Sequence, residues 1–94
     1  MGANTIGTNN TALGKNALIA NTTGVQNTVV GSLAGTSITT GTNLSILGYL
    51  AEPSSGTATN EITLGNTSVA RFRVPGIDLD LNKNIEIMNI MGAY

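Results

Sequence analysis

The sequence predicts an all-β fold, in which short strands stack into a parallel β-roll or β-solenoid with 17-residue coils. Glycines recur at a spacing of 17 residues along most of the chain. Val, Ile, Leu and Thr, which favour strands, occupy the positions before these glycines. Charge is scarce, with no Asp, Glu, Lys or Arg between Lys15 and Glu52. Together these features indicate strands that are stacked in register, coil upon coil.

Two series of glycines share the 17-residue spacing. The first series is Gly14, Gly31, Gly48 and Gly65. The second series is Gly7, Gly24 and Gly41, after which Ala58 and Pro75 take the same position. Two series in one period predict two corners per coil, where glycine is expected because the backbone needs a positive φ. Asn beside such corners tolerates the same backbone region and can form ladders up the stack.

A strand is expected to end at each corner of the first series. The residues directly before these glycines are Leu13, Val30, Leu47 and Leu64. One residue earlier stand Ala12, Val29 and Ile46. Seventeen residues have room for two short strands and two tight turns. Such a unit cannot bury its own apolar face, so coils are expected to stack about 4.8 Å apart and to cover one another.

Both sides of this strand are apolar. Side chains alternate along a strand, so the Leu13 column and the Ala12 column point in opposite directions. The interior of one coil covers only one side of the strand. We therefore expect other copies of the chain to cover the second side in a closed symmetric assembly.

The first repeats resemble a known class of sequences. NTALGKNALIANTTG, at residues 10–24, resembles the head repeats of YadA-type trimeric autotransporter adhesins and, more closely, repeated units of bacteriophage tail fibres. The resemblance extends over residues 4–76 and is strongest in the first two repeats. It implies a left-handed parallel β-roll in each chain and a homotrimer of such rolls around one axis. The two apolar columns would then divide between roll interior and trimer interface, and which column takes which role stays open.

The C-terminal segment has a different pattern. Ile77, Leu79 and Leu81 alternate with Asp78 and Asp80, which is the period of a strand with one wet face. LDLNKNIEIMNI resembles the segments that follow such repeats in phage fibres, where three chains intertwine. We therefore expect two units, a repeat β-roll over residues 1–76 and an intertwined β stalk over residues 77–94.

The composition argues against common forms of catalysis and metal binding. The chain has no His and no Cys, which removes the usual bases and zinc ligands. We therefore predict no catalytic residue, no metal and no cofactor. A net charge of −1 argues against nucleic acid, and no apolar run is long enough for insertion into a membrane. Glu52 and Glu61 are interpreted as solvated loop charges.

Two groups of side chains have more than one interpretation. Arg71 and Arg73 share a strand face and would either bind an anionic sugar or phosphate, or pair with Asp78 and Asp80 of the same or a neighbouring chain. The second interpretation is favoured because the charges match in number. Tyr49 would either stack on a sugar ring or pack over the third corner.

These features together favour a structural protein that is not an enzyme. The expected role is a segment of a trimeric phage tail fibre or similar virion appendage, which supports or forms the host-receptor attachment. Its partners would be copies of itself, other virion or fibre proteins, and a host-surface glycan. One alternative is a bacterial trimeric adhesin head at the cell surface. Another is a monomeric β-solenoid that binds carbohydrate or ice through a flat Thr array, although Gly56 interrupts the column of Thr22 and Thr39.

Overall fold

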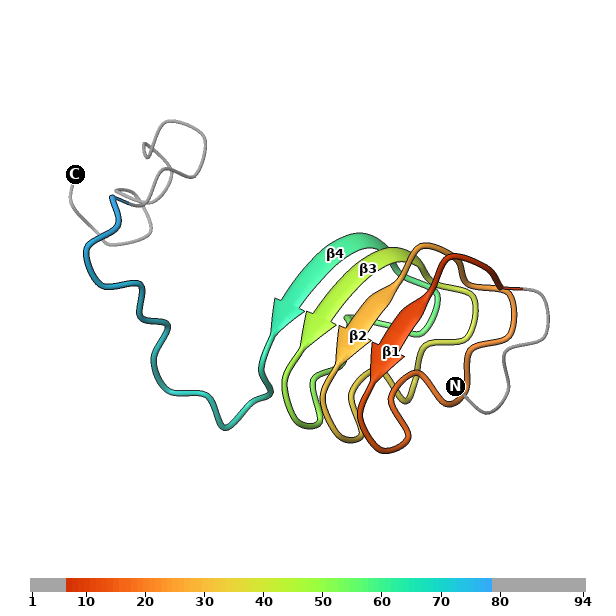
Figure 1. The fold of residues 1–94 in the computed structure, drawn as a ribbon, viewed down its shortest axis with the longest axis horizontal. Helices are drawn as coiled ribbons and strands as arrows, with labels where there is room; N and C mark the ends of the chain where they lie inside the picture. The colour runs from red at the N-terminus through yellow and green to blue at the C-terminus, as the bar shows by residue number, and fades with distance from the viewer. Residues whose placement is uncertain (1–6, 79–94) are drawn as a thin grey trace.

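The chain forms a stack of coils, each of which contributes one strand to a single sheet (Figure 1). The computed structural model describes residues 7–78. The strands are β1 (Thr11–Leu13), β2 (Thr28–Val30), β3 (Thr42–Leu47) and β4 (Thr59–Leu64). They pair in parallel in the order β1-β2-β3-β4, and the described residues contain no helix. The prediction of an all-β fold with parallel strands is confirmed.

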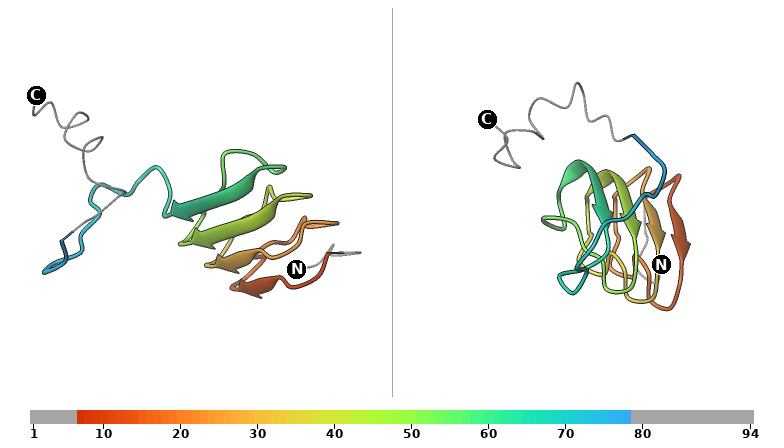
Figure 2. Two further views of the ribbon diagram at one scale, coloured as in Figure 1. Left: turned by 90° about the horizontal axis from the view of Figure 1, so that it is seen from above. Right: turned by 90° about the vertical axis from the view of Figure 1, so that its left-hand side faces the viewer.

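The register of the sheet follows the period of the sequence. Ala12 of β1 pairs with Val29 of β2, and Val29 pairs with Ile46 of β3. β3 and β4 continue the same register, with Leu47 opposite Leu64. Every pairing therefore joins residues that are 17 apart in the sequence. Figure 2 shows the four coils one behind another along the axis of the stack.

The second side of each coil is irregular, so the expectation of two strands per coil is wrong. Backbone hydrogen bonds still join neighbouring coils there, as from Leu18 N to Ala34 O (3.0 Å) and from Gly35 N to Ala51 O (2.8 Å). Leu33 and Gly35 have φ of 60° and 64°, which lie in the left-handed region. Because these left-handed residues interrupt the extended backbone, the segment between them is too short to form a strand.

The two glycine series serve different purposes. Gly31 and its equivalents in the first series have positive φ, as expected, at 129°, 136°, 126° and 85° for Gly14, Gly31, Gly48 and Gly65. Gly24 and Gly41 do not, so the expectation of positive φ is wrong for them. They are close to the next coil instead, and a Cβ on Gly24 would collide with the carbonyl oxygen of Gly41. The left-handed residues at this corner are Asn9, Gln26, Asn43 and Asn60.

The core lies between the sheet and the irregular side. Its buried apolar side chains are Ala17, Leu18, Val29, Ala34, Ile38, Leu44, Ile46 and Ala51. Val29 and Ile46 are almost fully buried, and Ala12 packs against the same cluster from the first coil. The column of Ala12, Val29 and Ile46 therefore faces the interior of the coil. This answers the question that the sequence left open about this column.

Two asparagines continue the core as a polar ladder. Asn10 Nδ2 donates to Gly24 O (2.8 Å), and its Oδ1 accepts from Asn27 N (2.9 Å). Asn27, one coil later, donates to Gly41 O (2.8 Å) and accepts from Leu44 N (3.0 Å). The two side chains thus satisfy backbone groups that the interior hides from water. The expectation that Asn forms ladders up the stack is confirmed.

The chain leaves the stack after β4. The last bonds to the coil below run from Gly65 N to Leu47 O (2.8 Å) and from Asn66 Nδ2 to Tyr49 O (2.7 Å). All residues from Thr67 to Asp78 are exposed, and Figure 1 shows this segment extending away from the coils. Of the predicted stalk, only Ile77 and Asp78 fall within the described residues, so the stalk lies outside them.

Candidate interaction surface

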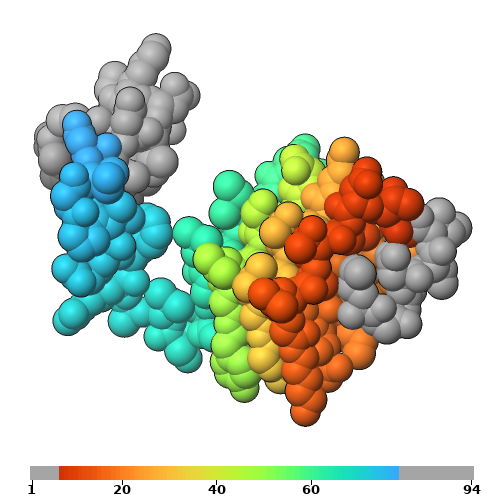
Figure 3. All heavy atoms as spheres, viewed as in Figure 1, coloured from red at the N-terminus to blue at the C-terminus, as the bar shows by residue number. Residues whose placement is uncertain are grey.

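One face of the sheet points away from the interior and carries a row of apolar side chains. We call this row the apolar stripe; it consists of Leu13, Val30, Leu47 and Leu64. Leu13 is 67% exposed, Leu47 53% and Leu64 51%, whereas Val30 is partly buried. Because the register repeats without a gap, the stripe runs straight along the stack. Figure 3 shows the coils as closely packed bands that form one continuous body.

The side chains beside the stripe carry no charge. On the same face lie Thr11, Thr28, Ser45 and Ile62, and Ile62 is 74% exposed. Leaving large aliphatic side chains in water costs about 25 cal/mol per Å² of apolar surface. A row of such side chains without nearby charge is typical of an interaction surface. Packing against a second apolar face would remove that cost.

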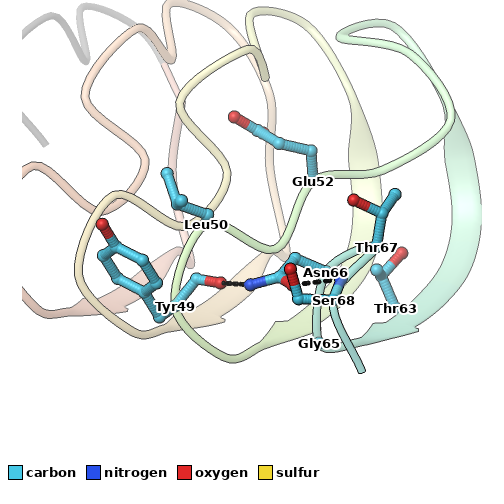
Figure 4. Close-up of a pocket in the computed structure, with 8 residues that line it drawn as sticks. All are labelled: Tyr49, Leu50, Glu52, Thr63, Gly65, Asn66, Thr67 and Ser68. Carbon is cyan, nitrogen blue, oxygen red and sulfur yellow. Dashed lines mark hydrogen bonds between the residues drawn. The ribbon is translucent and has the colours of Figure 1, made fainter. Parts of the chain in front are cut away.

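A groove lies at the end of the stack where the chain departs (Figure 4). It has a volume of about 760 Å³ and is lined by Tyr49, Leu50, Glu52, Thr63, Gly65, Asn66, Thr67 and Ser68. Asn66 shapes one wall, since its Nδ2 donates to Tyr49 O (2.7 Å) and its Oδ1 accepts from Ser68 N (2.7 Å). The groove thus combines residues of the third corner with those that follow β4.

The two glutamates of the coils stabilise turns. Glu52 accepts hydrogen bonds from the backbone and hydroxyl groups of both Thr36 and Ser37 in the coil below. Glu61 accepts hydrogen bonds from the backbone and hydroxyl groups of Ser54. The hydrogen bond from the Ser54 hydroxyl, followed by that from its backbone N–H, lowers the pKa of Glu61. Both carboxylates therefore have structural partners, which the sequence pattern did not reveal.

The charged residues after the stack lie in its exposed C-terminal segment. Arg71, Arg73 and Asp78 are all exposed, and no ion pair joins them within residues 7–78. Asp80 lies outside the described residues. Pairing of these groups with a neighbouring chain stays a prediction.

Acidic side chains are scattered over the described coils. Residues 7–78 contain no group of three or more His, Cys, Asp or Glu side chains placed to hold a metal ion. The same residues include no helix with the length and hydropathy that a membrane span requires.

The sequence indicated two apolar columns without showing that the Leu13 column is the exposed one, and it did not indicate the groove. The available signal was Tyr49, because the equivalent positions of the first two coils hold Lys15 and Ser32. An aromatic side chain in a column that otherwise holds polar side chains marks that corner as different. The groove itself arises because the chain leaves the stack, which depends on the whole fold.

The apolar stripe and the groove are interpreted from the side chains that form them. Comparison of the chain with family models, with curated proteins and with solved structures gave no match. The resemblance to adhesin and tail-fibre repeats therefore depends on the repeated residues alone.

Proposed function

We propose that the chain is a structural, non-enzymatic segment of a homotrimeric phage tail fibre or similar virion appendage, and that it supports or forms the host-receptor attachment. Each chain contributes one β-roll, and three rolls pack around a common axis through their apolar stripes. The C-terminal segment continues as an intertwined stalk.

The observation that carries this proposal is the exposure of the apolar stripe. The Ala12 column fills the interior of the coil, so the neighbouring Leu13 column is left in water on a single chain. A closed ring of identical copies covers such a stripe without leaving a further apolar surface. The number of three copies comes from the resemblance of residues 10–24 to trimeric repeats.

A bacterial trimeric adhesin head shares the same architecture and is the nearest alternative. A monomeric solenoid with a flat ice-binding or carbohydrate-binding Thr array has less support. The hydroxyls of Thr22 and Thr39 donate to carbonyl oxygens of the next coil, at 3.2 Å and 3.5 Å. Gly56 ends that column because a Cβ there would collide with the carbonyl oxygen of Ser37.

The oligomeric state tests the proposal. Light scattering coupled to size exclusion is expected to give three times the 9.6 kDa of one chain. Leu47→Glu places a charge in the middle of the stripe and is expected to yield monomers with an unchanged β-sheet circular dichroism spectrum. Leu47→Val is the matched control, since Val30 already occupies the same column, and it is expected to keep the trimer.

Thr23→Glu serves as a second control because Thr23 is exposed but lies outside the sheet. It is expected to leave the mass unchanged. A monomeric wild-type protein would contradict the proposal, and so would a trimer that survives Leu47→Glu.

A further inference from the structure

We infer that the groove at the end of the stack binds a neutral sugar residue, with the ring of Tyr49 as the apolar platform. This inference adds a ligand class to the proposed host attachment, and it rests on that proposal only for its biological meaning. The groove is present on a single chain, so binding can be measured separately from assembly.

The aromatic ring is the first argument. Tyr49 is 58% exposed, and Figure 4 shows its ring at one end of the groove beside Leu50. Within the coils it is the one aromatic side chain, since the remaining aromatics are Phe72 and Tyr94. An exposed ring offers a flat apolar face, which suits the C–H face of a pyranose, and a polar hydroxyl at its rim.

The polar lining is the second argument. Thr63, Thr67 and Ser68 contribute hydroxyl groups, each of which can donate and accept a hydrogen bond. The amide of Asn66 is held in place by its bonds to Tyr49 O and from Ser68 N, and it retains a second N–H for a ligand. A few fixed polar groups around an apolar platform are what orients a small polyhydroxylated ligand.

The charges indicate that the ligand is neutral. Among residues 7–78, no Lys or Arg lines the groove, so no cation of this part of the chain would balance a sulfate or a carboxylate there. Glu52 is the one carboxylate that the described residues place in the lining, and both of its oxygens already accept hydrogen bonds from Thr36 and Ser37. Sialylated and sulfated sugars are therefore expected to be rejected.

The position and size of the groove fit an end-on contact. At the corners of the first two coils, formed by Gly14 and Gly31, the next coil lies close. A Cβ on Gly31 would come within 2.5 Å of Gly48 O. The chain departs after Gly65, so the third corner has no complete coil above it. The volume of about 760 Å³ lies within the usual range for small-molecule sites, which is roughly 300–1,000 Å³. An open groove of this size admits the terminal sugar of a longer glycan.

The test uses saturation-transfer NMR on the full chain with the methyl glycosides of glucose, galactose, mannose and N-acetylglucosamine. N-acetylneuraminic acid and glucose 6-sulfate form the charged arm. We expect at least one neutral glycoside to bind and neither charged sugar to do so. Tyr49→Ala is expected to weaken binding at least about tenfold, and Tyr49→Phe to change it less than about threefold.

Phe72→Ala is the matched control, because Phe72 is 67% exposed but lies outside the groove. It is expected to leave binding unchanged. The inference is overturned if no neutral glycoside binds, if a charged sugar binds better, or if Tyr49→Ala binds as well as the wild type. It is also overturned if Tyr49→Ala changes the oligomeric mass, since the groove would then hold a neighbouring copy. Failure of sugar binding with the trimer intact would leave the proposed function standing.

Discussion

Buried polar side chains join neighbouring coils of this stack through hydrogen bonds to the backbone. Asn27 is fully buried, yet its amide joins the carbonyl oxygen of Gly41 to the N–H of Leu44. Buried backbone groups without a partner cost about 1–3 kcal/mol each. An amide in this position therefore replaces bonds that a regular strand would otherwise supply.

Replacing Asn27 by Ala is expected to destabilise the protein by about 2–4 kcal/mol, because two buried backbone groups lose their partner. The measurement is urea unfolding at one fixed protein concentration. Thr23→Ala, an exposed change in the same coil, is expected to stay within about 0.5 kcal/mol. Equal effects of the two substitutions would show that the amide ladder contributes nothing.

A second prediction concerns the stability lost when a glycine with a positive φ is replaced by alanine. Gly31→Ala combines a positive φ of 136° with a Cβ that would lie 2.5 Å from Gly48 O, so a loss of at least about 2 kcal/mol is expected. Gly76→Ala also has a positive φ, of 79°, but meets nothing within 4 Å. Without a steric clash, it is expected to cost only about 1 kcal/mol. Thermal unfolding of both variants checks the ranking.

At the scale of the element, a carboxylate stabilises the loop that leads into β4. Glu61 accepts two hydrogen bonds from Ser54, which hold its pKa below the ordinary value of 4.5. Because the folded-state pKa is lowered, these bonds contribute stability above the pKa of the unfolded chain. That contribution is lost as the pH falls through the lowered pKa of the folded state.

Ser54→Ala is therefore expected to raise the pKa of Glu61 toward its ordinary value, because the hydroxyl is the largest cause of the shift. The measurement is an NMR titration of the Glu61 side-chain carboxyl. Ser55→Ala is the control, since the Ser55 hydroxyl contacts Thr57 and not Glu61. A pKa that does not move in Ser54→Ala would contradict the assignment.

The strands could be predicted from the sequence, but the second side of each coil could not. Val29 and Ile46 stand in columns of β-formers before a glycine, and these local signals survive in the fold. The irregular side depends on Leu33 and Leu50, which take a positive φ that their type disfavours. The positive φ of these leucines is imposed by the stacking of the coils, so no local sequence pattern predicts it.

The candidate interaction surface could likewise be predicted only in part from the sequence. The alternation of side chains around Leu13 and Leu47 was sufficient to predict two apolar columns on opposite sides of the strand, but not which of them is exposed. Which side faced inward was settled by the buried partners of Val29, such as Ala34 and Ile38, which lie elsewhere in the coil. The groove depends on where the chain leaves the stack after Gly65, so sequence spacing did not indicate it.

At the scale of the whole molecule, the constant register allows a coil to be removed. Deletion of residues 25–41 takes out one period and brings Gly24 next to Thr42, with every column still in line. Stability in such stacks is approximately the sum of coil and neighbour contributions. The shortened protein is expected to keep a cooperative β-sheet unfolding transition at a lower Tm.

Deletion of residues 25–40 provides the control for this experiment. It removes one residue fewer, so the side chains of β3 and β4 change faces relative to β1. We expect this variant to lose the transition and to aggregate. Equal behaviour of the two deletions, measured by circular dichroism melting, would show that the period does not determine the packing.

The constant separation of 17 residues between paired positions has a consequence for the synthesis of the protein. Within residues 7–78, each strand after β1 pairs with one that the ribosome completed 17 residues earlier. A nascent polypeptide can therefore wind up turn by turn as it emerges, with its newest sheet edge ready for the next segment. The outward leucines are added in the same order, so the apolar stripe grows by one side chain with each completed coil.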